Sequence, residues 1–139
     1  MEVLQPRSRC GTVVFRYIDY RLPVPKQKLN PLPSAAFQIL LALVDEDLHG
    51  YGIMRQVADQ TGGRMRLGPG TLYSSLQTLL EGRFIEEAVP REDPQLGHER
   101  RRYYRLTRAG RKLARSEADR LADLLRVART KRILRGDYV

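Results

Sequence analysis

The stretch GPGTLYSSLQTLLEGRFIE, residues 68–86, places two glycines and a proline directly before a run with helical periodicity. At 100° per residue its leucines fall within one third of the circumference, and its polar side chains point away from them. The leucines are Leu72, Leu76, Leu79 and Leu80; the outward residues are Gly70, Ser74, Gln77, Thr78 and Glu81, with Thr71 and Tyr73 on the flanks. The pattern predicts a helix over residues 70–81 that leucines hold to a core and that stops at Gly82.

Glycine-rich turns before helices are also typical of phosphate-binding loops. A Walker loop needs a terminal Gly-Lys-Ser/Thr, and the GPGT sequence has no lysine. A dinucleotide fingerprint needs a preceding strand, a third glycine and a βαβ frame, which this stretch lacks. We therefore do not expect a nucleotide site. The polar face has two remaining interpretations: an ordinary solvated surface, or side chains that hydrogen-bond base edges and phosphates.

Two further helices are expected before this one. Ser34 has the character of an N-cap for a helix over residues 35–46, and a second helix is expected over residues 51–61, stopped by the TGG sequence at 61–63. The positions expected to be buried are Phe37, Leu40, Leu41 and Val44 in the first, and Ile53, Met54, Val57 and Ala58 in the second. With the helix at 70–81, these make a compact three-helix unit.

Two β-rich segments follow, RFIEEAV at 83–89 and RRRYYRL at 100–106, separated by the polar tract 90–99. They predict a hairpin with a long charged tip. Alternation puts Arg101, Tyr103 and Arg105 on one face of the second strand and Arg102, Tyr104 and Leu106 on the other. Three helices and a basic hairpin indicate a mainly α fold, the winged helix-turn-helix, in which the third helix lies in the major groove and the hairpin reaches the neighbouring backbone.

Thr107 is expected to cap a last helix that continues to about Leu134. Within it, five small or apolar residues follow a heptad-like spacing, namely Ala114, Ala118, Leu121, Leu125 and Ala128, with Leu124 beside them. A helix of about 26 residues extends about 39 Å, more than a small winged domain covers. The spacing therefore favours a homodimer through this helix, and packing onto its own domain is the alternative.

The net charge of +9 is concentrated at one end of the chain. Residues 99–139 contain 14 Lys or Arg against 5 Asp or Glu, whereas residues 32–98 contain 5 against 9. A segmental positive field favours a polyanion-binding face. Arginines on the solvated face of a long helix are the alternative.

Catalytic, metal and membrane functions find little support in the residue types. Cys10 is the only cysteine, and His49 and His98 are the only histidines, too few for a zinc site or a Cys–His pair. The longest apolar stretch, residues 35–44, is shorter than the roughly 20 residues of a membrane span. We expect no catalytic residues, no metal and no cofactor, in a cytoplasmic protein that is not an enzyme.

Three regions are expected along the chain. Residues 1–31 form an extension, flexible or arising from a mis-assigned start, in which residues 12–22 alternate like a strand and residues 23–33 read as a proline-rich linker. Residues 32–106 form the winged domain. Residues 107–139 form the dimerisation helix and tail.

Several ordered motifs carry a family resemblance: His49-Gly50-Tyr51, residues 70–73 (GTLY), the leucines before Gly82, and Tyr103-Tyr104-x-Leu106-Thr107-x-x-Gly110. Over residues 34–120 the chain resembles the PadR-like bacterial transcriptional regulators, in the short subgroup with one helix after the wing. The resemblance implies a dimeric winged-helix repressor that binds pseudo-palindromic operators in double-stranded DNA. Some members also bind aromatic inducers; this chain has no tryptophan to stack on one, so an inducer stays unidentified and no ligand site is assigned.

The expected DNA contacts fall into two groups. The recognition helix contributes Gly70, Thr71, Tyr73, Ser74 and Gln77, and the wing with its flanking loop contributes Arg64, Arg66, Arg101, Tyr103 and Arg105. Two other classes of function remain open at this point. The winged domain could bind a partner protein, as the acidic balance of residues 32–98 allows, or a structured RNA.

Overall fold

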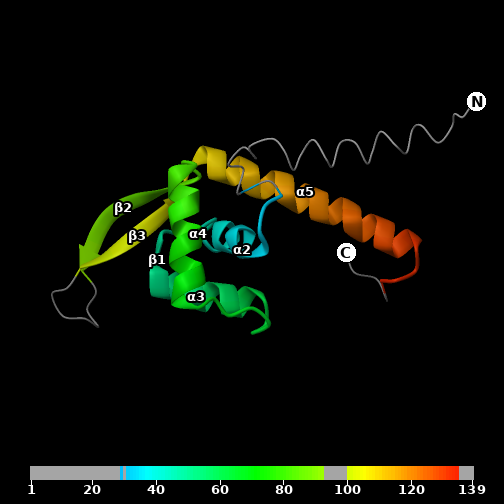
Figure 1. Ribbon diagram of the computed structural model, residues 1–139, viewed down its shortest axis with the longest axis horizontal. Coiled ribbons are helices and arrows are strands. Elements are labelled where there is room, and N and C mark those ends of the chain that lie inside the picture. Colours follow the sequence, from blue (N-terminus) through cyan, green and yellow to red (C-terminus); the bar gives the residue numbers. More distant parts are fainter. Residues whose placement is uncertain (1–28, 30, 93–99, 135–139) are drawn as a thin grey trace, which may run out of the picture. The chain divides into compact units, whose positions relative to one another are not determined.

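The computed structural model describes residues 29, 31–92 and 100–134 (Figure 1). The chain divides into two compact units, residues 1–31 and 32–139, and the elements below belong to the second. The strand-like alternation at 12–22, Cys10, His98 and most of the polar tip lie outside the described residues.

Four helices and three strands make up the described part of the second unit. In chain order they are α2 (Ser34–Ala42), β1 (Leu48–His49), α3 (Gly50–Gln60), α4 (Pro69–Glu81), β2 (Ile85–Glu92), β3 (Arg100–Leu106) and α5 (Arg108–Thr130). Figure 1 shows β2 and β3 projecting to one side of the helices and α5 running in the opposite direction. This arrangement confirms the winged helix-turn-helix fold with a long helix after the wing.

The sheet has three antiparallel strands in the order β1-β3-β2, where the sequence predicted a two-stranded hairpin. The added strand, β1, pairs Leu48 with Tyr104 and His49 with Tyr103. Two residues are too few to show an alternating pattern, which is why the sequence did not reveal it. β2 also continues three residues past the predicted end at Val89, across an irregularity that contains Pro90. Proline has no N–H to donate to a ladder, so it is tolerated at such a position.

The core lies between the first three helices and the sheet. α4 buries Leu72, Leu76 and Leu79 completely or nearly so, as its leucine spacing predicted, whereas Leu80, also expected to face the core, is only partly buried. The other large side chains shielded from solvent are Ile39, Leu40, Ile53, Val57 and Ile85. Burial of such side chains contributes about 1.5–3 kcal/mol each, so α4 is firmly fixed to the unit.

The first helix differs from its prediction. α2 ends at Ala42 instead of Glu46, and Pro33, not Ser34, occupies the N-cap position, without a side-chain hydrogen bond. Leu41 is exposed, because the face of α2 that meets the core carries Ala36, Ile39 and Leu40.

The turn from α4 into β2 places a left-handed backbone at an arginine. Gly82 was expected to take the left-handed position, but its φ is −80° and Arg83 has φ 61°. The Arg83 N–H donates to the Leu80 carbonyl at 3.0 Å and the Phe84 N–H to the Leu79 carbonyl at 3.0 Å, the pairing of a Schellman motif. Gly82 is needed for space instead, because a Cβ there would lie 2.6 Å from the Phe84 ring.

The start of α5 locks onto this turn. Thr107 caps α5 as predicted, accepting from the Gly110 N–H at 3.0 Å, and its hydroxyl also donates to the Phe84 carbonyl at 2.9 Å. A Cβ at Gly110 would overlap the Phe84 carbonyl oxygen. The Thr-x-x-Gly sequence therefore joins α5 to the winged domain. No helix among the described residues is both long and apolar enough to cross a membrane.

Candidate nucleic-acid interface

The face of α4 opposite its leucines carries the residues expected to read DNA. Gly70, Ser74 and Gln77 lie on this face, with Thr71 and Tyr73 at its flanks. Gly70 and Thr71 belong to the first turn of α4, and Tyr73 and Ser74 belong to the second. The Ser74 hydroxyl donates to the Thr71 carbonyl at 3.2 Å, and the Gln77 amide donates to the Glu81 carboxylate at 3.3 Å. These contacts stay within the helix surface, so oxygen atoms of both side chains remain able to accept hydrogen bonds from a ligand.

Tyr73 connects the second turn of α4 to the start of α3. Its hydroxyl lies over Gly50, where an added Cβ would be only 3.0 Å away. The Tyr73 side chain is nevertheless 56% exposed. The glycine in the His-Gly-Tyr motif thus gives Tyr73 room to reach across from α4 to α3.

His49 caps α3, a role that the sequence did not reveal. Its Nδ1 accepts from the Gly52 N–H at 3.0 Å, which assigns the proton of the neutral ring to Nε2. The ring packs edge-on against Tyr103, with centroids 5.3 Å apart, and parallel to Tyr51 at 6.4 Å. A histidine directly before a Gly-rich helix start was the available signal, although histidine is not among the residues that commonly cap helices.

Arg101 reaches this histidine from β3. Its Nη1 lies 3.1 Å from Nδ1 and 3.2 Å from Nε2 of His49, nearly equal distances that place the guanidinium over the ring face. The Arg101 Cζ is also 6.0 Å from the centre of the Tyr51 ring, and the Arg55 Cζ is 5.9 Å from the same ring. His49, Tyr51, Arg55 and Arg101 are called the Tyr51 cluster below. A guanidinium close to aromatic rings can also interact with an anion, through the N–H groups in its own plane.

Arg105, another predicted wing contact, is paired with acidic side chains. It binds the Asp47 carboxylate at 3.1 Å and approaches Glu86 at 3.9 Å, while about half of its side chain stays exposed. The hydrogen bond and charge of Asp47 raise the pKa of Arg105 above its usual value. Arg105 can therefore contact a phosphate only in competition with these carboxylates.

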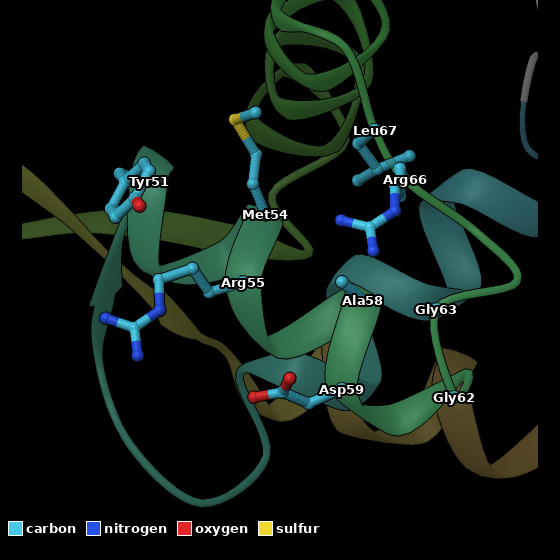
Figure 2. Close-up of a pocket in the computed structure, with 9 residues that line it drawn as sticks. All are labelled: Tyr51, Met54, Arg55, Ala58, Asp59, Gly62, Gly63, Arg66 and Leu67. Carbon is cyan, nitrogen blue, oxygen red and sulfur yellow. The ribbon is translucent and has the colours of Figure 1, made fainter.

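Arg66 lies beside α3 and borders an open hollow of about 490 Å³ together with Met54 and Ala58 (Figure 2). Arg64 is exposed in the same turn, which Gly62 and Gly63 form with φ values of 61° and 80°. The structure thus brings Arg66 and Tyr51 to one hollow.

Tyr51 also borders a second hollow of about 310 Å³, called the α3–β3 hollow. It is lined by His49, Gly50, Tyr51, Tyr73, Arg101, Arg102 and Tyr104. Burial raises the pKa of Tyr104, with nearby Glu87 and Tyr73 adding to the effect and Arg102 opposing it. The hollow joins α3, α4 and β3, so the predicted reading helix and the predicted basic strand border one surface.

The predicted dimer positions on α5 differ in burial. Ala114 is buried in the chain's own domain, but Ala118 is exposed and Leu125 is 50% exposed. Leu121 and Ala128 are intermediate. From Ala118 onward, the described part of the chain therefore leaves this side of α5 open.

Comparison with known proteins agrees with this geometry. The model of the transcriptional regulator PadR-like family matches residues 39–116. A transcriptional regulator from Clostridium thermocellum is 25% identical, with a TM-score of 0.58, over 68% of this chain and 89% of that one. A PadR family transcription regulator from Clostridium difficile is 23% identical, with a TM-score of 0.60, over 70% and 97%. Bacillus subtilis PadR, solved in complex with operator DNA, is 17% identical, with a TM-score of 0.53, over 77% and 51%.

A curated relative is similar at the sequence level. An uncharacterised 37.1 kDa protein in transposon Tn4556 of Streptomyces fradiae is 39% identical over 91 residues, which is 66% of this chain. The chain spans 24% of the length of that relative.

Proposed function

The chain belongs to the PadR-like family of transcriptional regulators, and we propose that it is a sequence-specific DNA-binding regulator that acts as a dimeric repressor at a pseudo-palindromic operator. The winged domain, residues 32–106, binds double-stranded DNA, and residues 107–139 hold two copies together. The protein acts in the cytoplasm, and no catalytic role, metal or cofactor is proposed for it. The small-molecule inducer, if one exists, has no assigned site.

One observation carries the proposal: Tyr73 of α4 and Arg101 of β3 line the same hollow. A recognition helix and a basic strand that border one surface can contact one duplex together, the helix in the major groove and the strand at the adjoining backbone. The leucine face of α4 is buried, so its polar face is the one available to DNA.

The roles of the side chains follow from their chemistry. Thr71, Ser74 and Gln77 present hydroxyl and amide groups of the kind that hydrogen-bond base edges. Gly70 allows the helix backbone to come close to the duplex. The residues that position the protein on the phosphates are Arg64, Arg66, Tyr73, Arg101, Tyr103 and Arg105.

A dimer supplies the second half-site. Leu121 and Leu125 lie on the side of α5 that its own domain leaves open, and a second copy would cover them. A symmetric pair of recognition helices reads half-sites one helical turn apart, about 10 base pairs centre to centre, which is why the operator is expected to be pseudo-palindromic.

Selection of duplexes from a random DNA pool tests the proposal. The result expected is enrichment of a sequence with two-fold symmetry, whose binding weakens steeply as salt rises. If no duplex is enriched and the protein elutes from heparin at low salt, the winged domain is a protein-interaction module instead. Preference for structured RNA in direct competition would assign it to RNA.

A further inference from the structure

We propose that the α3–β3 hollow is the seat of a single backbone phosphate of the bound duplex, held by the Tyr51 cluster together with Tyr73. This inference rests on the proposed function and adds to it a specific contact with one phosphate. Arg101 and Tyr73 were among the expected DNA contacts, whereas Tyr51, Arg55 and His49 were not.

The charge of the hollow suits an anion. Arg101 and Arg102 line it, and none of the described residues that line it is acidic. Arg55 adds a third guanidinium at the Tyr51 ring.

The aromatic rings orient the cations. Arg101 lies over the His49 face and near the Tyr51 ring, and His49 is itself fixed by the Gly52 N–H and by Tyr103. These contacts already restrict the Arg101 side chain, so it loses less freedom when it binds a ligand. A guanidinium is planar and can donate two parallel hydrogen bonds to the non-bridging oxygens of a phosphate.

Two phenol hydroxyls complete the donor set. Tyr51 and Tyr73 line the hollow from α3 and α4, and their side chains are 57% and 56% exposed. A phenol O–H donates to a phosphate oxygen as a neutral partner beside the charged guanidinium.

The position of the hollow favours a phosphate of the duplex over a free phosphate. Tyr73 lines the hollow and lies directly before Ser74 in α4, about one turn before Gln77. When Ser74 and Gln77 contact bases in the major groove, the phosphate backbone at the edge of that groove passes close to the hollow. Base reading and backbone anchoring then involve neighbouring residues of one helix.

The experiment uses the duplex selected by the wild-type chain, prepared as a series in which one phosphate at a time is a neutral methylphosphonate. Affinities are measured for the wild type, Tyr51→Phe and Arg101→Gln. Arg126→Gln is the matched control, since Arg126 is an exposed arginine at the far end of α5. Tyr51→Phe keeps the ring on which the arginines stack and removes only the hydroxyl, so it retains the fold.

At one phosphate per half-site we expect the methylphosphonate to weaken wild-type binding about tenfold or more, as for removal of a hydrogen bond to a charged group. The same replacement should reduce the duplex affinity of Tyr51→Phe and Arg101→Gln much less, because each variant has already lost part of its contact with that phosphate. Arg126→Gln should retain the full wild-type effect at that position.

Equal effects at every phosphate for all four proteins would overturn this inference while leaving the proposed function in place. Failure of the wild type to enrich any duplex would overturn both. Displacement of the duplex by millimolar inorganic phosphate at constant ionic strength, in the wild type but not in Tyr51→Phe, would assign the hollow to a free phosphate compound and refute the backbone assignment.

Discussion

Replacing Gly70 by alanine should stabilise the folded chain and weaken its binding to DNA. Gly70 has no left-handed backbone that would require glycine, and a Cβ at this position would meet nothing within 4 Å. Alanine in a helix is favoured over glycine by about 0.5–1 kcal/mol, and the first turn of α4 should realise the lower end. At about 4–8 °C per kcal/mol for a domain of this size, the melting temperature should rise by about 2–4 °C.

The same methyl group should weaken DNA binding. Nothing among the described residues requires a glycine at position 70. We therefore propose that Gly70 provides clearance for a duplex that approaches the α4 backbone. A methyl forced into a packed contact costs about 1–3 kcal/mol, which corresponds to roughly 5- to 150-fold in affinity for each half-site.

Thermal melting followed by circular dichroism measures the first effect, and anisotropy titration of the selected duplex measures the second. Gly110→Ala is the contrasting variant, because its Cβ would overlap the Phe84 carbonyl and so destabilise the fold. A Gly70→Ala protein that melts higher and binds the duplex as tightly as the wild type would refute the clearance argument.

Three further predictions concern packing, assembly and pH. Gly110→Ala should lower the free energy of unfolding by more than about 2 kcal/mol, seen in guanidinium denaturation, because the Phe84 backbone must move; an unchanged midpoint would contradict the docking of α5. Leu125→Asp should halve the mass measured by light scattering, whereas Val127→Asp, equally exposed on the opposite side of α5, should not. Stability should fall as pH rises above about 10, since burial raises the pKa of Tyr104 and the unfolded chain ionises first. Tyr104→Phe should show a smaller decrease between about pH 8 and 10.5, on either side of the ordinary tyrosine pKa, and an equal decrease would assign the effect elsewhere.

The sequence predicted the fold well where periodicity was strong. The leucine spacing in α4 and the Thr107 cap were both confirmed, because each is a local pattern with one stable solution. The helix limits were predicted less accurately, and α2 ends at Ala42. The face of α2 that packs against the core carries Ala36, Ile39 and Leu40, and the chain then turns toward β1.

The candidate site was less accessible to sequence reasoning. Alternation in β3 placed Arg101 and Arg105 on one face, but it could not show that β1 lies beside them and supplies His49 as a partner for Arg101. Nor could it show Asp47 paired with Arg105, 58 residues away in sequence. Such pairs depend on tertiary structure, and the alternation of side chains along one strand carries no information about it.

The central claim is that α4 and the wing bind one duplex together, and salt titration of the selected duplex tests it most directly. A dimer that neutralises six or more phosphates should give a log–log slope of about −5 or steeper, and should bind the selected sequence at least about 10³-fold more tightly than a shuffled one. Arg101→Gln should make the slope shallower by about 0.9 for each phosphate that the variant no longer neutralises. A slope near zero, or equal affinity for selected and shuffled duplexes, would contradict the account.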